Sequence, residues 1–216
     1  MTKFREIINL GMHPFADTFI KKDQLNKSEP IYPLKCYLNQ KNCLISNSII
    51  TDDETRYNLY EYSYTSSNSL VSRNYWKQYA KKIIKNFNIN SKTKILEIGS
   101  NDGYLIGQFR QKTKKILGVD ASNYMVKLAN KKNIKTVKYI FNIENANKIK
   151  NKFGYFDLII ANNVLNHSNK PLDFIKGVSN ILSKNGVFIY ESPYWYNLVK
   201  MKKFDQIYHE HVSYFT

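Results

Sequence analysis

The sequence predicts a doubly wound α/β fold built around a mostly parallel sheet. From about residue 94 onward, short apolar runs alternate with stretches of helical periodicity, as expected for strands covered by helices on both faces. The stretch 95–105, ILEIGSNDGYL, takes one such strand through Gly99 and Gly103 into a helix. Asp120 then ends a second apolar strand about twenty residues later. This pattern is typical of a nucleotide-type cofactor site at the carboxyl ends of the strands.

Residues 1–68 are expected to form a separate, small and irregular N-terminal domain. Pro14, Pro30 and Pro33 interrupt it, and 32–38 is a short strand-like piece. Its end is rich in tyrosine and serine, which suits either a packing surface or part of a site. The residues concerned are Tyr57, Tyr60, Tyr62, Tyr64 and 66–69.

Residues 69–216 are expected to form the α/β domain. A helix is predicted over 70–87, and its apolar stripe comprises Val71, Tyr75, Trp76, Tyr79, Ile83 and Ile84. Strands are predicted at 94–98, 115–119, 136–141, 156–161 and 187–191, and further helices at 103–111, 122–131, 171–182 and 194–204. Gly186 is expected to form the turn into the last of these strands.

Composition limits the possible partners. The chain has 216 residues, 43% of them hydrophobic, and a formal net charge of +16. Such a charge could indicate nucleic-acid binding. We favour a charge that follows from AT-rich coding, because the lysines are scattered and Asn and Ile are abundant. Arg, the usual base reader, is also scarce. A basic surface would still attract an anionic, nucleotide-linked substrate.

The sequence also predicts a compartment. No apolar run approaches the roughly 20 residues of a membrane helix, and the charged start at 1–6 has no signal-peptide pattern. Cys36 and Cys43 are too few for a disulfide framework. We therefore expect a cytoplasmic protein without a membrane partner.

Polar side chains follow two of the expected strands and gather again later in the chain. Ligands of parallel sheets sit outside the carboxyl ends of the strands, so these side chains are candidates for a site. They are Asn162, Asn163, Asn166 and His167; then Glu191, Ser192 and Tyr194; then Tyr208, His209, Glu210 and His211.

The segment 208–211 is open to three interpretations. The spacing of His209 and His211 suits adjacent metal ligands, but no clear third ligand is indicated. A neutral imidazole beside a carboxylate could instead act as a general base near pH 7. The third possibility is a polar tail. We favour the general base.

The cofactor turn resembles that of class I, Rossmann-like methyltransferases that use S-adenosyl-L-methionine (SAM). It lacks the third glycine of G-x-G-x-x-G, and Glu97 precedes Gly99 by two residues. The resemblance implies that Glu97 supports the methionine end of SAM and that Asp120 binds the ribose. Asp157 corresponds either to a further acidic motif or to an exposed strand start. The implied cofactor-binding residues are Glu97, Gly99, Ser100, Asn101, Asp102, Gly103, Asp120, Ala121, Asn162 and Asn163.

Across nearly its whole length the chain resembles the nucleotide-sugar C-methyltransferases that act on C-3 of 4-keto deoxysugars, the tylosin and tetronitrose type. Their cofactor turn shares the unusual Asn-Asp pair, and their signature shares Tyr-His-Glu-His. The matching segments are 10–19 (LGMHPFADTF), 62–67 (YSYTSS), 75–80 (YWKQYA), 97–103 (EIGSNDG), 161–167 (ANNVLNH) and 204–215 (FDQIYHEHVSYF).

This resemblance implies a mechanism. A base removes the C3 proton made acidic by the C4 ketone, and the resulting carbanion takes the methyl group of SAM. His211 is the implied base and His209 the second choice. Glu210 assists, and Tyr208 contacts the sugar or enolate. The implied substrate residues are Tyr64, Ser66, His167 and Glu191.

Two departures from the family stand out. The family has an N-terminal zinc module with two Cys-x-x-Cys pairs. Here the first pair is missing, and in the second Cys43 holds one cysteine position and Gln40 the other, so we expect no zinc. Family members also continue well past residue 216. The resemblance therefore implies a C-terminally truncated chain that lacks the last sheet strands. A second chain that supplies them is one alternative, and a fragment of a split or truncated gene is the other.

Three alternatives to an active C-methyltransferase stay open. The chain could be a non-catalytic or split-gene fragment that binds SAM without turnover. It could be an O- or N-methyltransferase of another small molecule. An RNA methyltransferase is the third, but it would leave 208–211 unexplained.

Overall fold

The structure of the chain is a computed structural model that describes residues 3–16, 20, 22–49, 51–58 and 64–216. Parts of two sequence motifs, 17–19 and 62–63, lie outside the described residues, as does Tyr60. The chain forms two compact units. Unit 1 combines Met1–Ser63, Asn163–Pro171 and Glu191–Thr216, and unit 2 combines Tyr64–Asn162 and Leu172–Tyr190.

This division differs from the expected boundary at residue 68. Residues 191–216, assigned above to the α/β domain, pack within unit 1 because strand β9 (Ser213–Tyr214) pairs with β3 (Ile45–Asn47). Such a pairing joins segments far apart in the sequence, so local periodicity carries no signal for it.

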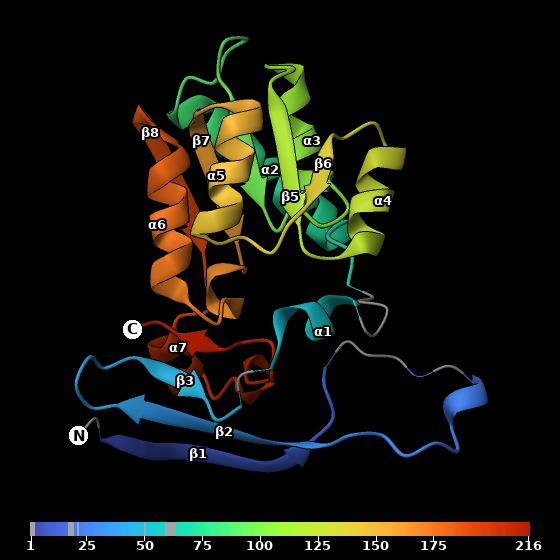
Figure 1. Cartoon of the computed structure of the whole chain (residues 1–216), viewed down its shortest axis with the longest axis vertical. Helices are drawn as coiled ribbons and strands as arrows, with labels where there is room; N and C mark the ends of the chain where they lie inside the picture. Colours follow the sequence, from blue (N-terminus) through green and yellow to red (C-terminus); the bar gives the residue numbers. More distant parts are fainter. Residues whose placement is uncertain (1–2, 17–19, 21, 50, 59–63) are drawn as a thin grey trace. The chain divides into compact units, whose positions relative to one another are not determined.

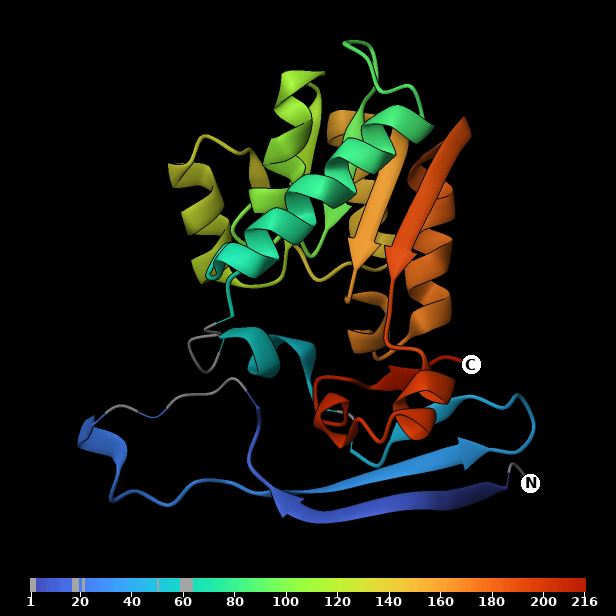
Figure 2. The same cartoon turned by 180° about the vertical axis from the view of Figure 1, so that it is seen from behind.

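Unit 2 is built on a five-stranded sheet. Figures 1 and 2 show this sheet with its helices from the front and from behind. The strand order β6-β5-β4-β7-β8 places the earliest strand, β4, at the centre, with β5 on one side and β7 on the other, which is the doubly wound arrangement predicted from the sequence. The pairs β4–β5, β4–β7 and β5–β6 are parallel, with Leu96 beside Leu117 and Ile159. The strands are β4 (Ile95–Ile98), β5 (Ile116–Asp120), β6 (Thr136–Lys138), β7 (Phe156–Asn162) and β8 (Leu182–Glu191).

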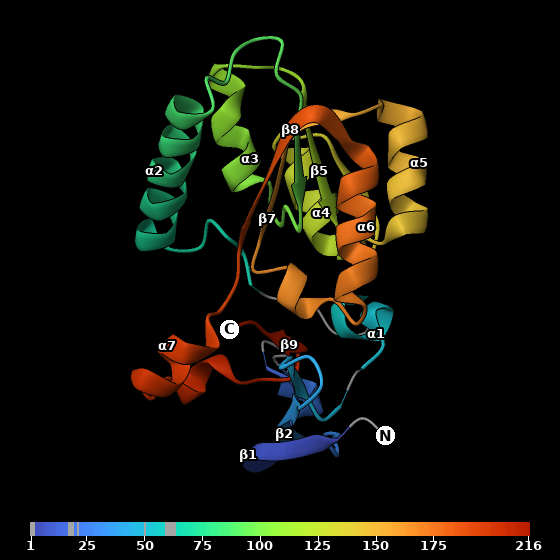
Figure 3. The ribbon, with the colours of Figure 1, turned by 90° about the vertical axis from the view of Figure 1, so that its left-hand side faces the viewer.

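Helices cover both faces of this sheet. Figure 3 shows α2 and α3 on one face and α5 and α6 on the other. Ser69 caps α2 by accepting from the Ser72 backbone N–H, in a capping box. The helices are α2 (Leu70–Asn86), α3 (Tyr104–Gln108), α4 (Asn123–Lys131), α5 (Ile143–Phe153) and α6 (Pro171–Ile181), with a 3-10 turn at Phe109–Gln111.

Several predicted details of unit 2 are wrong. Helix α5 was missed because its sequence, IENANKIKNKF, is largely polar, and only Ala146 and Ile149 are buried in it. Gly186 lies inside β8 instead of in a turn before it. On α2, Val71 is 80% exposed, whereas the unpredicted Ala80 is fully buried beside Trp76 in the core.

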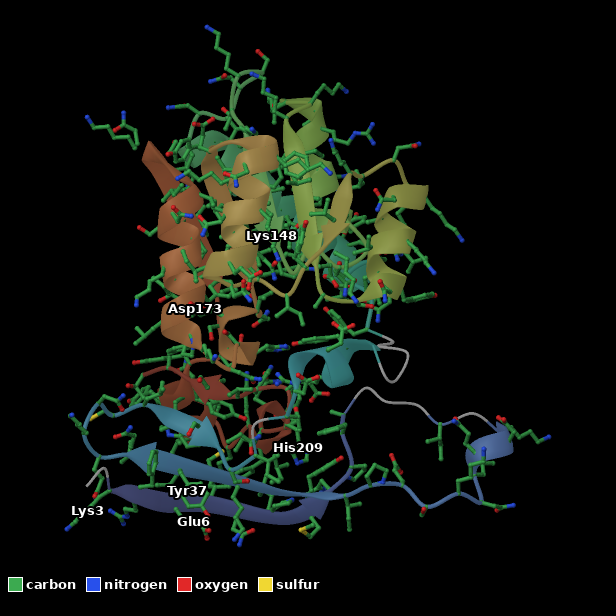
Figure 4. The ribbon with its side chains drawn as sticks, in the orientation of Figure 1. Lys3, Glu6, Tyr37, Lys148, Asp173 and His209 are labelled. Atoms are coloured by element: carbon green, nitrogen blue, oxygen red, sulfur yellow. The ribbon has the colours of Figure 1, made fainter. Side chains whose placement is uncertain are left out.

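Unit 1 contains a four-stranded antiparallel sheet of order β1-β2-β3-β9, so the N-terminal part is more regular than predicted. On its first two strands, Glu6 accepts from the Tyr37 hydroxyl at 3.0 Å and from Lys35 Nζ at 3.2 Å (Figure 4). Its other elements are β1 (Phe4–His13), β2 (Tyr32–Asn39), α1 (Asp53–Asn58), α7 (Trp195–Lys200) and 3-10 turns at Lys22–Gln24, Leu165–His167 and Phe204–Gln206.

The core of unit 1 joins early and late residues. Leu34, Cys36 and Ile45 pack with Ile207 and Tyr214. Helix α7 ends at Lys200, earlier than the predicted 204, and contributes Leu198 to this core.

None of the helices among the described residues is long and apolar enough to cross a membrane. Within the same residues, no cluster of three or more His, Cys, Asp or Glu side chains could hold a metal ion; Cys36 is buried and Cys43 exposed.

Candidate cofactor and catalytic sites

The turn after β4 depends on two glycines. Gly99 has a φ of 68° and Gly103 a φ of 77°, both in the left-handed region that favours glycine. Gly103 is also the N-cap of α3, and a Cβ there would lie 2.9 Å from Ile134 Cγ2. The turn therefore brings backbone N–H groups to the carboxyl end of β4, as the sequence predicts.

Glu97 lies on β4, just before this turn. Its carboxylate is buried and accepts from the Ile106 backbone N–H in the first turn of α3 at 2.9 Å. Burial raises the pKa of Glu97 well above its usual value, although the Ile106 hydrogen bond acts in the opposite direction. Glu97 thus joins the strand to the start of the helix.

Asp120 ends β5 and is buried. One carboxylate oxygen accepts from the Asn101 backbone N–H at 2.7 Å and the other from the Ser122 backbone N–H at 2.9 Å. Burial raises the pKa of Asp120 to about 6. Each oxygen of a carboxylate can accept a second hydrogen bond, so both can still take a ribose hydroxyl. Ala121 follows directly in the loop to α4.

Asn101 and Asp102 form hydrogen bonds with residues that no sequence motif links to them. Asn101 Oδ1 accepts from the Ser66 backbone N–H at 2.9 Å, and its Nδ2 donates to the Tyr64 carbonyl at 2.9 Å. Asp102 accepts from the hydroxyls of Ser66, at 2.8 Å, and Ser67, and it pairs with Lys132 Nζ at 2.8 Å.

We call Ser66, Ser67, Asn101, Asp102 and Lys132 the turn clasp. Burial alone would raise the pKa of Asp102, but its hydrogen bonds with Lys132, Ser67 and Ser66 hold that pKa below its usual value. Ser66, expected near the substrate, therefore lies against the cofactor turn. No spacing rule links residues so far apart in sequence.

Two buried polar atoms fit a polar ligand at this end of the sheet. Among the described residues, Ser100 Oγ and Asn162 Nδ2 are buried without a hydrogen-bond partner. Asn162 Oδ1 accepts from the Tyr79 hydroxyl at 3.0 Å, so Tyr79 joins the site from a position predicted only as core. Buried polar groups are nearly always satisfied, and SAM offers hydroxyl, amine and carboxylate groups that would satisfy these.

Asp157 stands at the opposite end of the sheet. It is exposed at the start of β7 and accepts from the Lys94 backbone N–H at 2.9 Å and the Ser183 hydroxyl at 3.1 Å. The interpretation as an exposed strand start is the one the structure supports. A pocket of about 370 Å³ also lies at these amino ends, lined by Lys94, Lys114, Lys115, Ile116, Leu117, Lys135, Phe153 and Phe156.

His211 lies in unit 1 with a defined tautomer. Its Nδ1 lies 2.8 Å from the Gln206 carbonyl oxygen. A carbonyl can only accept, so Nδ1 carries the proton and Nε2 of the neutral ring holds the lone pair. Burial lowers the pKa of His211 to about 4. The ring is therefore neutral at pH 7, with a free pair available at Nε2.

His167 adjoins this ring from another part of unit 1. The two ring centroids lie 5.0 Å apart, and the Tyr208 ring lies 3.9 Å from that of His211. His167 Nδ1 and the Tyr57 hydroxyl are 2.9 Å apart, whereas its Nε2 is buried without a partner among the described residues. Burial lowers the pKa of His167 well below its usual value, and the charges of the nearby His211 and Arg56 lower it further. Arg56 donates to the His167 carbonyl at 2.9 Å.

His209 has different surroundings. It is 1% exposed, and its ring packs edge-on against Phe15, at 5.4 Å, and Tyr32, at 6.0 Å (Figure 4). Burial lowers its pKa. Glu210, the next residue in the chain, is also buried. The rings of His167, Tyr208 and His211 thus form one cluster, which we call the histidine cluster. The His209 ring instead packs with Phe15 and Tyr32.

Asn163 and Glu191, predicted for cofactor and substrate, contact each other. Asn163 Nδ2 donates to a Glu191 carboxylate oxygen at 3.1 Å, and the Asn163 backbone N–H donates to the Glu191 carbonyl at 2.7 Å. Tyr64, the other predicted substrate residue, belongs to unit 2 and is 42% exposed.

Comparison with known proteins matches this chain to methyltransferases. A model of the methyltransferase domain family matches residues 72–216. The C-methyltransferase NovU of Streptomyces niveus is 24% identical over 211 residues, which are 98% of this chain and 50% of that protein. The uncharacterized methyltransferase C70.08c of Schizosaccharomyces pombe is 29% identical over 119 residues, 51% of this chain and 44% of that protein. The chain therefore spans about half the length of the curated relatives it matches.

Among solved structures, a SAM dependent methyltransferase from Archaeoglobus fulgidus has a TM-score of 0.49 at 16% identity, with 62% of this chain and 61% of that chain covered. The family match runs from within α2 to Thr216, over more than half of the sequence. This protein belongs to the methyltransferase domain family.

Proposed function

We propose that this protein C-methylates a nucleotide-linked 4-keto deoxysugar. NovU, which aligns with almost the whole chain, is a C-methyltransferase, and this supports carbon as the methyl acceptor. The net charge of +16 suits an anionic sugar nucleotide. The observation that carries the proposal is the tautomer of His211, whose Nδ1–H on the Gln206 carbonyl leaves Nε2 as a proton acceptor.

His211 is the proposed base. Its Nε2 removes the C3 proton of the keto-sugar, and the electron pair of the C–H bond moves toward the C4 carbonyl to give an enolate. The imidazolium that forms is stabilised by the Gln206 carbonyl and by the face of the Tyr208 ring. His211 then returns the proton to solvent.

Tyrosine hydroxyls are the proposed donors to the enolate. Tyr208 adjoins His211, and Tyr64, which precedes the serines, is 42% exposed. A hydrogen bond to the developing oxyanion would strengthen in the transition state and so accelerate enolisation. Glu210 and His167 would assist the cluster, Glu191 would border the acceptor, Ser66 would hold the cofactor turn, and His209 would have a packing role.

Unit 2 would hold the cofactor. Asp120 would accept from the ribose hydroxyls, and Ser100, Asn162 and the backbone of the turn would contact the polar groups of SAM, while Glu97 fixes the start of α3. When bound, SAM supplies the methyl group from its sulfonium and leaves as S-adenosylhomocysteine. Calorimetric titration with SAM tests this part, with Asp120→Ala expected to bind at least tenfold more weakly. Equal binding by both proteins would refute the role of Asp120.

Enolisation can be tested apart from methyl transfer. Thymidine-diphosphate 4-keto-6-deoxyglucose would be incubated with the protein in D₂O, and exchange of the C3 proton followed by NMR. We expect His211→Ala to abolish the exchange, and the exposed His13→Ala to serve as the matched control. Exchange that continues unchanged in His211→Ala would rule out His211 as the base.

A second candidate function follows from coverage. Because the chain spans about half the length of its curated relatives, it could bind SAM without turnover on its own. SAM binding by the calorimetric assay, together with no C3 exchange and no methylated sugar, would favour this function.

A further inference from the structure

The turn clasp connects the predicted cofactor acid to a predicted acceptor residue. The Asn101 backbone N–H donates to Asp120 at 2.7 Å, and the Asn101 side-chain amide donates to the Tyr64 carbonyl at 2.9 Å. A single residue therefore lies between Asp120 and the backbone of Tyr64, all within unit 2.

Asn101 is held in a conformation that makes these bonds possible. Its φ is 52°, in the left-handed region that asparagine tolerates better than most residues. Its Oδ1 accepts from the backbone N–H groups of Ser66 and Asp102 at 2.9 and 2.8 Å, and the Ser66 hydroxyl, whose single hydrogen is directed at Asp102, lies 3.3 Å away. Nearly all the hydrogen-bonding capacity of the residue is used for protein groups.

Asp102 fixes the same segment from the other side. Its side chain is 1% exposed and accepts from two serine hydroxyls and from Lys132. A buried carboxylate that loses its donors is left uncompensated, so the ionised Asp102 favours the state in which Ser66 and Ser67 stay in place.

We propose that Asn101 and Asp102 are positioning residues that couple cofactor binding to the order of the segment 64–67. A ligand that fixes Asp120 also fixes the Asn101 N–H, and through its side chain the backbone of Tyr64 and Ser66. Bound SAM thereby stabilises the segment that carries Tyr64. The coupling rests on the proposed function, because it takes Asp120 as a SAM contact and Tyr64 as an acceptor contact.

Asn101→Gly is the decisive variant. Glycine keeps the positive φ without strain and removes only the side-chain amide. Asn133→Gly is the matched control, since Asn133 is exposed in the same unit with a φ of 59°. Lys132→Met removes the ion pair with Asp102, and Lys131→Met, on the neighbouring exposed lysine, is its control.

The experiment measures amide hydrogen exchange over residues 64–69, with and without SAM, beside the calorimetric dissociation constant and a thermal unfolding curve. In the wild type and in both controls, we expect SAM to slow exchange in this segment at least tenfold. In Asn101→Gly we expect this protection to be lost and SAM to bind about tenfold more weakly, while the Tm stays near that of Asn133→Gly. Lys132→Met should show a smaller loss in the same direction.

Two outcomes would overturn the proposal. One is SAM-bound wild type whose segment exchanges as fast as without SAM. The other is Asn101→Gly that keeps both protection and affinity. Failure of the proposed function is distinguishable from these outcomes, because it would appear as a wild type that binds SAM without C3 exchange, or that binds no SAM. Exchange over 64–69 without SAM would still compare Asn101→Gly with Asn133→Gly and test the clasp.

Discussion

Replacing Gly103 by alanine should lower the free energy of unfolding of unit 2 by about 2–5 kcal/mol. An alanine in the left-handed region costs about 1–2 kcal/mol, and Gly103 has a φ of 77°. The new Cβ would also lie 2.9 Å from Ile134 Cγ2 and 3.2 Å from Ala129 Cβ. Ile134 is 5% exposed and Ala129 fully buried, so neither can move away freely, and overpacking of this kind costs about 1–3 kcal/mol.

Gly107 offers a matched comparison against the same neighbour. It lies inside α3, and a Cβ there would meet the flexible end of Ile134, Cδ1, at 3.3 Å. Alanine is favoured over glycine in a helix by about 1 kcal/mol, so we expect Gly107→Ala to be neutral or slightly stabilising. Urea unfolding followed by circular dichroism would give both values from the midpoint at constant m. Equal shifts for the two variants, or a loss below about 1 kcal/mol for Gly103→Ala, would refute the reasoning.

Two further predictions concern pH. Burial raises the pKa of Asp120 to about 6, so the folded protein binds this proton more tightly than the unfolded chain does. The resulting contribution to the free energy of unfolding is complete below the unfolded pKa of about 3.9. It is lost as the pH rises through 6, a change of roughly 3 kcal/mol. Asp120→Asn should remove this slope from urea titrations between pH 4 and 7, and a slope that persists would contradict the assignment. Burial lowers the pKa of His211 to about 4, so its contribution is present above the unfolded pKa of about 6.5 and is lost as the pH falls to 4, again by roughly 3 kcal/mol. NMR titration should find the His211 ring neutral at pH 6, and His211→Phe should flatten the stability profile in this range; a ring that is half protonated near pH 6.5 would be the opposite result.

Local features of the fold and the cofactor turn could be predicted from the sequence. Gly99, Gly103 and Asp120 act through backbone geometry and strand ends, which neighbouring residues largely determine. The parallel strands likewise follow from short apolar runs. Helix α5 escaped prediction because most of its residues are polar and it has only two buried side chains, Ala146 and Ile149.

Contacts between distant segments could not be predicted. The bonds of Ser66 and Ser67 to Asp102 join hydroxyls to a carboxylate with no pattern in either segment. The approach of His167 to His211 likewise depends on how unit 1 folds, and the tautomer of His211 depends on a backbone carbonyl that no residue type reveals. Sequence resemblance supplied candidate residues, and only the structure separated His209 in the core from His211 in the histidine cluster.

The pairing of β3 with β9 has a consequence for how the chain folds during synthesis. Unit 2 draws on neighbouring strands and can form as soon as they leave the ribosome, whereas the sheet of unit 1 must wait for Ser213 and Tyr214. Until then, β3 has an open edge that another nascent chain could occupy. When the sheet of unit 1 is complete, residues 64–162 of unit 2 form the covalent loop between two segments of unit 1. A folded unit 2 shortens this loop and so lowers the entropic cost of closing it, which links the stabilities of the two units through the chain.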